Sequence, residues 1–194
     1  MNGLGGLLLA AGEGSRHGGP KALARHGGRP WVVIGVETLR VAGIDEIAVV
    51  LGSMADSVRP HLSTHDVRIV EHPGWRLGRT GSVQAGLRSL SRAARGVLIH
   101  QVDFPFVGAG TIAALARAFL TSTVPEERIV LPVHDGRRGH PIIIGRALWP
   151  EIAALGPDEP LRVVIHRDPT RVEEVTVPDR GIHRNLNTPL PEEA

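Results

Sequence analysis

A glycine-rich segment near the start of the chain ends in Lys21, the only lysine among 194 residues. The segment contains Gly12 and Gly14, followed closely by Arg16. Glycine lets backbone N–H groups approach an anion closely, and the two basic side chains add full positive charges. The lysine side chain ends in a compact ammonium group, whereas the arginine side chain ends in a planar guanidinium group. One lysine in a chain that otherwise uses arginine therefore indicates a site that needs an ammonium group. These residues predict a binding site for a polyphosphate.

This segment matches neither of the two commonest phosphate-binding motifs. A P-loop is excluded because no Gly-Lys-Ser/Thr sequence occurs. A dinucleotide motif is disfavoured because His17 stands where the third glycine is expected, and because residues 50–53, at the end of the next strand, include no acidic residue for a ribose. A dinucleotide-dependent oxidoreductase is therefore the weaker functional alternative, and a flexible glycine-rich turn is the structural one.

A second chemical feature is Asp103, which directly follows an apolar run over residues 96–102. The run has the character of a buried strand, so the carboxylate is expected at the carboxyl end of that strand, on the same edge of a sheet as the glycine-rich segment. A carboxylate in this place can hold Mg²⁺, which takes its other ligands from waters and substrate phosphates. The alternative is an aspartate that caps a turn near Pro105.

Strand-like and helix-like patterns alternate along the chain, which predicts an α/β fold with a mostly parallel sheet covered on both faces by helices, a three-layer α/β/α sandwich. We expect a single domain over residues 1–188 and a polar tail over residues 189–194. The expected strands are residues 5–9, 47–51, 67–70, 96–102, 129–133 and 141–144, and the expected helices are residues 31–42, 53–62, 82–94 and 111–120.

The composition is that of an ordinary globular enzyme, with 42% hydrophobic and 22% charged residues. No apolar run is long enough to span a bilayer, so no membrane partner is expected. The isoelectric point near 10.2 reflects one lysine and no tyrosine or cysteine, whereas the formal charge at pH 7 is only +2. With 3% aromatic residues, the chain offers little for stacking on bases, and no nucleic-acid partner is expected. The absence of cysteine is compatible with the cytoplasmic location that we expect.

Several short motifs occur in an order that resembles the MobA-like nucleotidyltransferases, which attach CMP or GMP to the phosphate of molybdopterin. Residues 9–21 are similar to the opening motif of that family. The later matches are Glu-His-Pro-Gly-Trp at 71–75 with the glycines and Ser82 that follow, Asp-Phe-Pro at 103–105, Arg-Gly-His-Pro at 138–141 and Asn-Thr-Pro at 187–189. The resemblance implies a Rossmann-like nucleotidyltransferase fold.

The resemblance also implies roles for individual residues. Catalytic roles fall to Arg16, Lys21 and Asp103. Mg²⁺ would be held by Asp103 and Asn187, although relatives have aspartates where this chain has Asn185 and Asn187. The acceptor would meet Arg138, Gly139 and His140. The nucleotide would be bound by Leu9, Ala10, Ala11, Gly12, Gly14, Ser15, Lys21, Gly81 and Ser82.

The activity that the resemblance implies is transfer of CMP from CTP to molybdopterin, with release of pyrophosphate. The opening Ala10-Ala11-Gly12 is similar to the cytidylyl branch of the family, and an alanine methyl group beside the base would narrow the pocket against a purine. Two alternatives accompany this interpretation. One is a nucleotide-binding protein that has lost turnover, suggested by Asn185 and Asn187, and the other is a transferase that acts on a sugar or alcohol phosphate.

Overall fold

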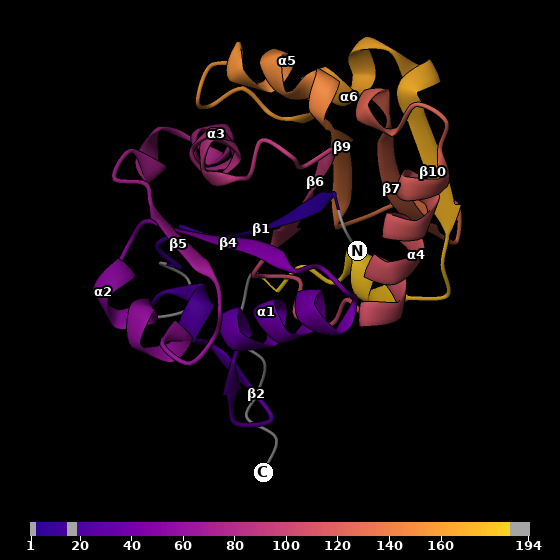
Figure 1. Ribbon diagram of the computed structural model, residues 1–194. Coiled ribbons are helices and arrows are strands. Elements are labelled where there is room, and N and C mark those ends of the chain that lie inside the picture. Colours follow the sequence, from indigo (N-terminus) through magenta and orange to yellow (C-terminus); the bar gives the residue numbers. More distant parts are fainter. Residues whose placement is uncertain (1–2, 15–18, 187–194) are drawn as a thin grey trace.

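The computed structural model describes residues 3–14 and 19–186, which are built around one eight-stranded mixed sheet (Figure 1). The strand order is β10-β7-β9-β6-β1-β4-β5, and β8 pairs with β7. The strands are β1 (Leu4–Ala10), β4 (Glu46–Leu51), β5 (Arg68–Glu71), β6 (Gly96–Gln101), β7 (Ile129–His134), β8 (Arg137–Arg138), β9 (Ile142–Gly145) and β10 (Val172–Thr176). A separate small hairpin joins β2 (Arg25–His26) to β3 (Arg29–Pro30).

The sheet is parallel except where the chain doubles back through β8 and β9. The strands β5, β4, β1 and β6 pair in parallel, as do β7 and β10, whereas β9 is antiparallel to both β6 and β7. The reversal begins at Asp135 and Gly136, which both have positive φ angles and form the two-residue turn between β7 and β8. Asp-Gly is a preferred sequence for such a turn. This reversal places Gly139 and His140 beside the carboxyl end of β6 rather than at the far end of the molecule.

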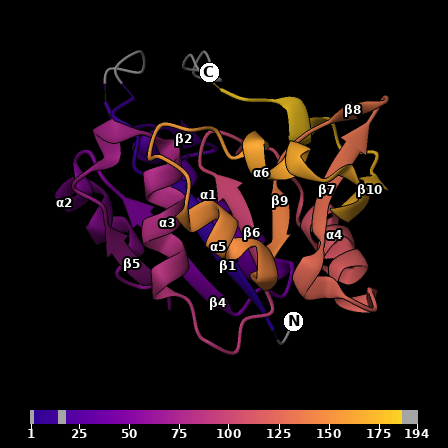
Figure 2. The same ribbon diagram turned by 90° about the horizontal axis from the view of Figure 1, so that it is seen from above.

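Helices cover both faces of the sheet (Figures 1 and 2). On one face lie α1, α2 and α4, whose apolar side chains form one core cluster with that face, and on the other lie α3, α5 and α6 with a second cluster. The α-helices are α1 (Trp31–Val41), α2 (Ala55–Val58), α3 (Arg79–Ser89), α4 (Ala109–Thr121), α5 (Trp149–Ala153) and α6 (Arg162–Arg167). The 3-10 helices are η2 (Lys21–Leu23), η3 (Arg59–Leu62), η4 (Trp75–Leu77), η5 (Pro125–Glu127), η6 (Arg146–Leu148), η7 (Pro169–Arg171) and η8 (Arg180–His183).

The α/β/α layering, the mostly parallel sheet and all six expected strands are confirmed. Some boundaries were wrong. The expected helix over 53–62 is α2 followed by η3, where Pro60 lies in the first turn. The expected helix over 82–94 begins at Arg79 and ends at Ser89, because Leu90 is extended and buried. The sequence patterns did not reveal α5, α6 or β10, which are short or carry charged residues between their apolar ones.

The carboxyl edge of the sheet is held together by bonds between loops that are distant in sequence. The N–H of Ser53 donates to the carbonyl of Ala11 at 3.1 Å, and the N–H of Leu186 donates to the carbonyl of Asp103 at 2.9 Å. Asp179 anchors the C-terminal segment through bonds from the N–H of Gly108 at 2.9 Å and the hydroxyl of Thr111 at 2.6 Å. This edge therefore gathers segments from the beginning, middle and end of the chain.

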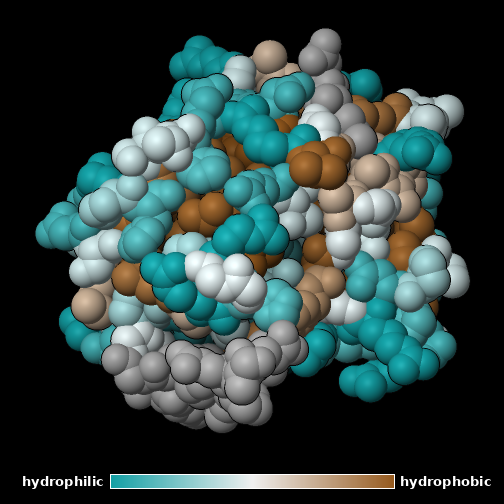
Figure 3. Space-filling model, turned by 90° about the horizontal axis from the view of Figure 1, so that it is seen from below, coloured by the Kyte–Doolittle hydropathy of each residue, from teal (hydrophilic) through white to brown (hydrophobic). Residues whose placement is uncertain are grey.

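The surface seen from below, on the side of α1 and α2, is mainly hydrophilic, and its hydrophobic residues form separate patches (Figure 3). No helix within residues 3–14 and 19–186 combines the length and hydropathy that a membrane crossing requires. The residues expected to form a polar tail, 189–194, lie outside the described residues.

Candidate functional site

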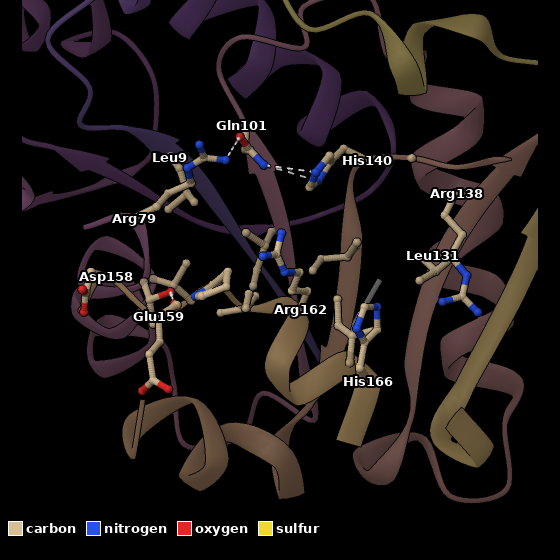
Figure 4. Close-up of a pocket in the computed structure, with 18 residues that line it drawn as sticks. Leu9, Arg79, Gln101, Leu131, Arg138, His140, Asp158, Glu159, Arg162 and His166 are labelled. Atoms are coloured by element: carbon tan, nitrogen blue, oxygen red, sulfur yellow. Dashed lines mark hydrogen bonds between the residues drawn. The ribbon is translucent and has the colours of Figure 1, made fainter. Parts of the chain in front are cut away.

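Two adjoining cavities open at the carboxyl edge of the sheet. The first, here called the glycine-loop cavity, has a volume of about 490 Å³ and is lined by Leu9, Ala11, Gly12, Gly14, Lys21, Trp75, Arg76, Arg79, Ser82, Gln101, Val102, Asp103 and Asn185. The second, here called the sheet-face cavity, measures about 670 Å³ and lies on the face covered by α3, α5 and α6 (Figure 4). The described residues that line both cavities are Leu9, Arg79 and Gln101. Molecules bound in the two cavities would therefore meet.

The two glycines of the loop cavity serve different purposes. Gly14 has a φ angle of +64°, and a Cβ atom there would lie 2.1 Å from the carbonyl oxygen of Gly19, so no larger residue fits. At Gly12, by contrast, no described atom lies within 4 Å of the place that a Cβ atom would take. Gly14 lets the chain fold back on itself toward Lys21, and Gly12 leaves its backbone open to a ligand.

The charged centre of the glycine-loop cavity is the pair Lys21 and Asp103, whose Nζ and Oδ2 atoms are 3.3 Å apart. Lys21 begins η2 directly after the loop, and Asp103 lies two residues beyond the end of β6. Both side chains are mostly buried, with exposed fractions of 19% and 16%. Electrostatic attraction is stronger in such partly desolvated surroundings than at an exposed surface. The pair combines a cation suited to phosphate with an anion suited to a metal ion in one cavity.

Among the side chains that line this cavity, Asp103 offers a carboxylate and Asn185 an amide oxygen to a metal ion, and Gln101 and Ser82 carry further neutral oxygens. No cluster of three or more His, Cys, Asp or Glu side chains suited to a metal ion occurs in the described part of the chain. One carboxylate and one amide oxygen fit Mg²⁺, which keeps several waters and is commonly held by one or two carboxylates together with substrate phosphates. They do not form an all-protein cage of the kind that a structural metal occupies.

The sheet-face cavity differs in chemistry from its neighbour. Its floor is apolar, formed by Leu9, Val83, Ile99, Leu131, Ile142, Leu161 and Ile165. Its polar side chains include Arg79, Arg138, His140, Arg162 and His166, together with Asp158 and Glu159. The segment over residues 157–159 is fixed to the start of α3, where the N–H of Gly81 donates to the carbonyl of Pro157 at 3.3 Å and the Thr80 hydroxyl donates to the carbonyl of Glu159. The cavity suits a molecule with an apolar body and an anionic group.

His140 stands at the border between the cavities. Burial lowers the pKa of His140, the nearby carboxylate of Asp103 opposes this shift, and the charge of Arg79 adds to it. The ring nitrogens lie 3.3 and 3.4 Å from Nε2 of Gln101, and Oε1 of Gln101 lies 3.4 Å from Nη1 of Arg79. With its pKa lowered, His140 is neutral at pH 7 and one of its ring nitrogens can accept a hydrogen bond from the Gln101 amide.

The structure gathers most of the expected site residues around these two cavities. Leu9, Ala11, Gly12, Gly14, Lys21, Ser82 and Asp103 line the glycine-loop cavity, and Arg138, Gly139 and His140 line the sheet-face cavity. Ala10 is buried in β1, and Gly81 packs against Pro157 and His72, so neither is part of the cavity walls. Ser15, Arg16 and Asn187 lie outside the described residues.

Sequence reasoning missed several residues that line the cavities, among them Trp75, Arg76, Arg79, Gln101, Arg162 and His166. Gln101 had a usable signal, because a polar residue that ends an apolar strand two positions before Asp103 belongs to the same edge. Trp75 ends the Glu-His-Pro-Gly-Trp match at 71–75, which gave it no role of its own, and the remaining residues carried no signal. Trp75 packs closely on Gly52. A Cβ atom added to Gly52 would lie 2.6 Å from the Cγ atom of Trp75, and this contact can be known only from the folded structure.

Comparison with known proteins agrees with this geometry. The family model of the MobA-like NTP transferase domain matches residues 6–173. Nicotine blue oxidoreductase of Paenarthrobacter nicotinovorans is 31% identical over 193 residues, which cover 94% of this chain and 91% of that protein.

Solved structures resemble the whole fold. A nucleotidyl transferase from Methanothermobacter thermautotroptrophicus superimposes with a TM-score of 0.80 at 24% identity, covering 97% of this chain and 93% of that one. Rv0371c from Mycobacterium tuberculosis H37Rv gives a TM-score of 0.78 at 25% identity, covering 91% and 88%, and has also been solved in complex with manganese. With the family model spanning most of its length and the loop, lysine and aspartate gathered in one cavity, the chain belongs to the MobA-like NTP transferase family.

Proposed function

We propose that the protein transfers a nucleoside monophosphate, CMP from CTP, to a phosphorylated acceptor, molybdopterin, and releases pyrophosphate. The observation that carries this proposal is the presence of Gly12, Gly14, Lys21 and Asp103 in the walls of one cavity. Membership of the family supports the use of a nucleoside triphosphate.

The triphosphate is assigned to the glycine-rich loop. The open backbone at Gly12 offers N–H groups, and Lys21 offers a positive charge directed at the same space. The resemblance to the family adds Arg16 to this group. Because the charge on the triphosphate spreads from the α-phosphorus to the leaving pyrophosphate during the reaction, cations fixed beforehand stabilise the transition state.

Asp103 is the proposed carboxylate ligand of Mg²⁺, with an amide oxygen of Asn185 or Asn187 beside it. When bound, Mg²⁺ would supply positive charge to the phosphate oxygens. Nζ of Lys21 lies 3.3 Å from Oδ2 of Asp103, so this carboxylate also has a cationic side chain as its partner. The single negative charge of the protein ligands implies a metal ion that is held mainly together with the nucleotide.

The acceptor is assigned to the sheet-face cavity, which adjoins the glycine-loop cavity at Leu9, Arg79 and Gln101. An acceptor phosphate is already ionised at pH 7, so its oxygen can attack the α-phosphorus without a strong general base. The protein contributes alignment of the two substrates and compensation of negative charge. The apolar floor of the cavity would pack against the ring system of the acceptor, and the polar side chains around it would meet the polar ring edge and the phosphate.

CTP is proposed over GTP because of the residues at the far end of the glycine-loop cavity. Ala11 is buried and its carbonyl is engaged by the N–H of Ser53, while Trp75 fills the space beside Gly52. An alanine methyl group and a packed indole leave less room for a purine than glycines would. A calorimetric titration in the presence of Mg²⁺ tests this choice. GTP binding at least about tenfold tighter than CTP binding, about 1.4 kcal/mol, would overturn it while sparing the transferase assignment.

The experiment for the activity itself is a screen of the four nucleoside triphosphates for Mg²⁺-dependent binding, followed by a pyrophosphate-release assay with molybdopterin and with sugar and alcohol phosphates. The proposal expects binding of CTP and pyrophosphate release with molybdopterin. Binding without pyrophosphate release, with every acceptor and metal ion, would identify a nucleotide-binding protein that has lost turnover.

A second candidate is an oxidoreductase, and the observation in its favour is the 31% identity to an oxidoreductase over 94% of this chain. The glycine-rich loop argues against a dinucleotide, because the third glycine and the acidic ribose ligand are missing. NAD(P) retained on purification, or oxidation of NAD(P)H in an absorbance assay, would favour this candidate over the transferase.

A further inference from the structure

Among the described residues, Arg79 is the only charged one that lines both cavities. It is the first residue of α3 and follows Gly78, whose φ angle of +148° and close contact with Pro157 admit only glycine. The chain turns at this glycine so that the Arg79 side chain reaches the carboxyl end of β6, where it meets Gln101 (Figure 4). Its position is therefore defined by the backbone on one side and by the sheet on the other.

Several charged groups around the cavities already have an ion-pair partner. Arg76 pairs with Glu13 at 3.2 Å and stacks over Trp75, and Arg138 pairs with Glu174 at 2.6 Å. Within the described part of the chain, Arg79 forms no ion pair, and its one hydrogen bond goes to a neutral amide oxygen. A guanidinium group without a carboxylate partner at the wall of a cavity is suited to an anion from outside the protein.

The neutral partner of Arg79 is itself held in place. Gln101 is buried, with an exposed fraction of 8%, and its amide group lies between Arg79 and His140. Since Oε1 of Gln101 accepts from Arg79, its Nε2 faces the ring of His140, whose nitrogens lie 3.3 and 3.4 Å away. The row Arg79–Gln101–His140 (Figure 4) orients the guanidinium without cancelling its charge, and two of its members, Arg79 and Gln101, line both cavities.

From this arrangement we infer that Arg79 is a catalytic residue, which contacts the phosphate groups of both substrates where they meet. The inference rests on the proposed function. In the reaction, an oxygen of the acceptor phosphate forms a bond to the α-phosphorus, and the bond from that phosphorus to the oxygen bridging to the β-phosphorus breaks. The leaving pyrophosphate keeps the electron pair of the broken bond. Arg79 binds nonbridging oxygens of the α-phosphate and the acceptor phosphate and opposes their mutual repulsion, while Gln101 acts as a positioning residue.

The test compares the wild-type protein with Arg79→Ala, Arg79→Lys and the control Arg88→Ala. Arg88 lies on the same helix, is exposed and lines neither cavity, so its replacement makes the same change in net charge. Pyrophosphate release is measured with Mg²⁺, CTP and molybdopterin, and the dissociation constant of Mg²⁺–CTP is measured by calorimetry. We expect Arg79→Ala to lower kcat about 100-fold or more, with a smaller loss of CTP affinity of about tenfold or less. Arg79→Lys should recover only part of this loss, because an ammonium cannot contact two phosphate groups as a planar fork does.

Turnover of Arg79→Ala within threefold of the wild type would overturn the inference, and so would an equal loss in Arg88→Ala. If the wild-type protein itself releases no pyrophosphate, the proposed function fails with this acceptor, and binding then decides the role of Arg79. Inorganic phosphate, used as the probe of the acceptor cavity, should bind the wild-type Mg²⁺–CTP complex at least about tenfold tighter than the Arg79→Ala complex. Equal phosphate affinity in the two proteins would contradict the assignment of Arg79.

Discussion

The glycine-loop cavity and the sheet-face cavity share three wall residues but are built in different ways. The first is formed by loops that follow parallel strands, and its centre is the ion pair of Lys21 with Asp103. The second lies on the face of the sheet, has an apolar floor and is closed by residues 158–166. The comparison indicates that chemistry common to nucleotide-binding enzymes is concentrated in a short loop, whereas the place for the acceptor depends on how distant segments pack together.

The largest expected effect falls on the glycine-loop cavity. Lys21→Ala should lower the rate of pyrophosphate release by about 10²–10³-fold, because a charge directed at the transferred phosphates is lost. Lys21→Arg should not restore the full rate, since a planar guanidinium replaces a point charge. The control is Arg25→Ala, a nearby cation outside both cavities that bonds to the carbonyl of Gly28. Near-normal turnover of either Lys21 variant at saturating CTP would refute a phosphate role for Lys21.

The next effect concerns β6, the strand that both cavities share. Burial, aided by the charge of His140, lowers the pKa of His100 to about 4. This value lies below the usual pKa of 6.5, so the unfolded chain binds the proton more readily than the folded one. The contribution of neutral His100 to the free energy of unfolding is therefore fully present above pH 6.5 and is lost as the pH falls toward 4.

The expected loss is on the order of 3 kcal/mol, at about 1.4 kcal/mol for each pKa unit. Denaturant unfolding between pH 7 and pH 4.5 measures it. His100→Leu should show a smaller fall in unfolding free energy over this range than the wild type, and His61→Leu should show the same fall as the wild type. Parallel curves for wild type and His100→Leu would contradict the assignment to this residue.

A smaller effect is expected at Gly139, where close packing between distant segments shapes the wall of the sheet-face cavity. A Cβ atom at Gly139 would lie 2.6 Å from the carbonyl oxygen of Ile182, so Gly139→Ala forces the loop away from the C-terminal segment. We expect a loss of about 1–3 kcal/mol in stability and a higher KM for the acceptor. Gly110→Ala is the matched control, because no described atom lies within 4 Å of the added methyl group. Equal thermal unfolding midpoints for the two variants would show that the contact at Gly139 is not restrictive.

The last prediction concerns the metal ion in the glycine-loop cavity, where one substitution is expected to strengthen metal binding and another to abolish turnover. Asn187→Asp should tighten Mg²⁺ binding by about tenfold, because it returns a negative charge to the proposed ligand set, whereas Asp103→Ala should abolish Mg²⁺ dependence and turnover together. Magnesium titration of nucleotide binding measures both. No change in either variant would leave Asp103 as a residue of the turn only.

The two cavities also differ in how far the sequence predicts them. The glycine-rich segment, Lys21 and Asp103 are recognisable because their residue types and local order carry the chemistry, and the six strands follow from apolar runs. The wall of the sheet-face cavity includes Arg162 and His166 on a six-residue helix whose pattern is too short to detect. Arg79 became visible only once the positive φ angle of Gly78 and the contact with Gln101 were known. Short motifs indicate the local chemistry, whereas contacts between distant segments, such as that of Arg79 with Gln101, can be known only from the fold.

The most direct test of the central claim, that the glycine-loop cavity holds the nucleotide, is one calorimetric comparison. Mg²⁺–CTP is titrated into the wild-type protein, Lys21→Ala and Arg162→Ala, the last of which removes a cation that lines only the sheet-face cavity. The account predicts that Lys21→Ala raises the dissociation constant at least about tenfold and that Arg162→Ala changes it less than about twofold. Equal affinities of the wild type and Lys21→Ala, or a loss confined to Arg162→Ala, would place the nucleotide elsewhere and contradict the account.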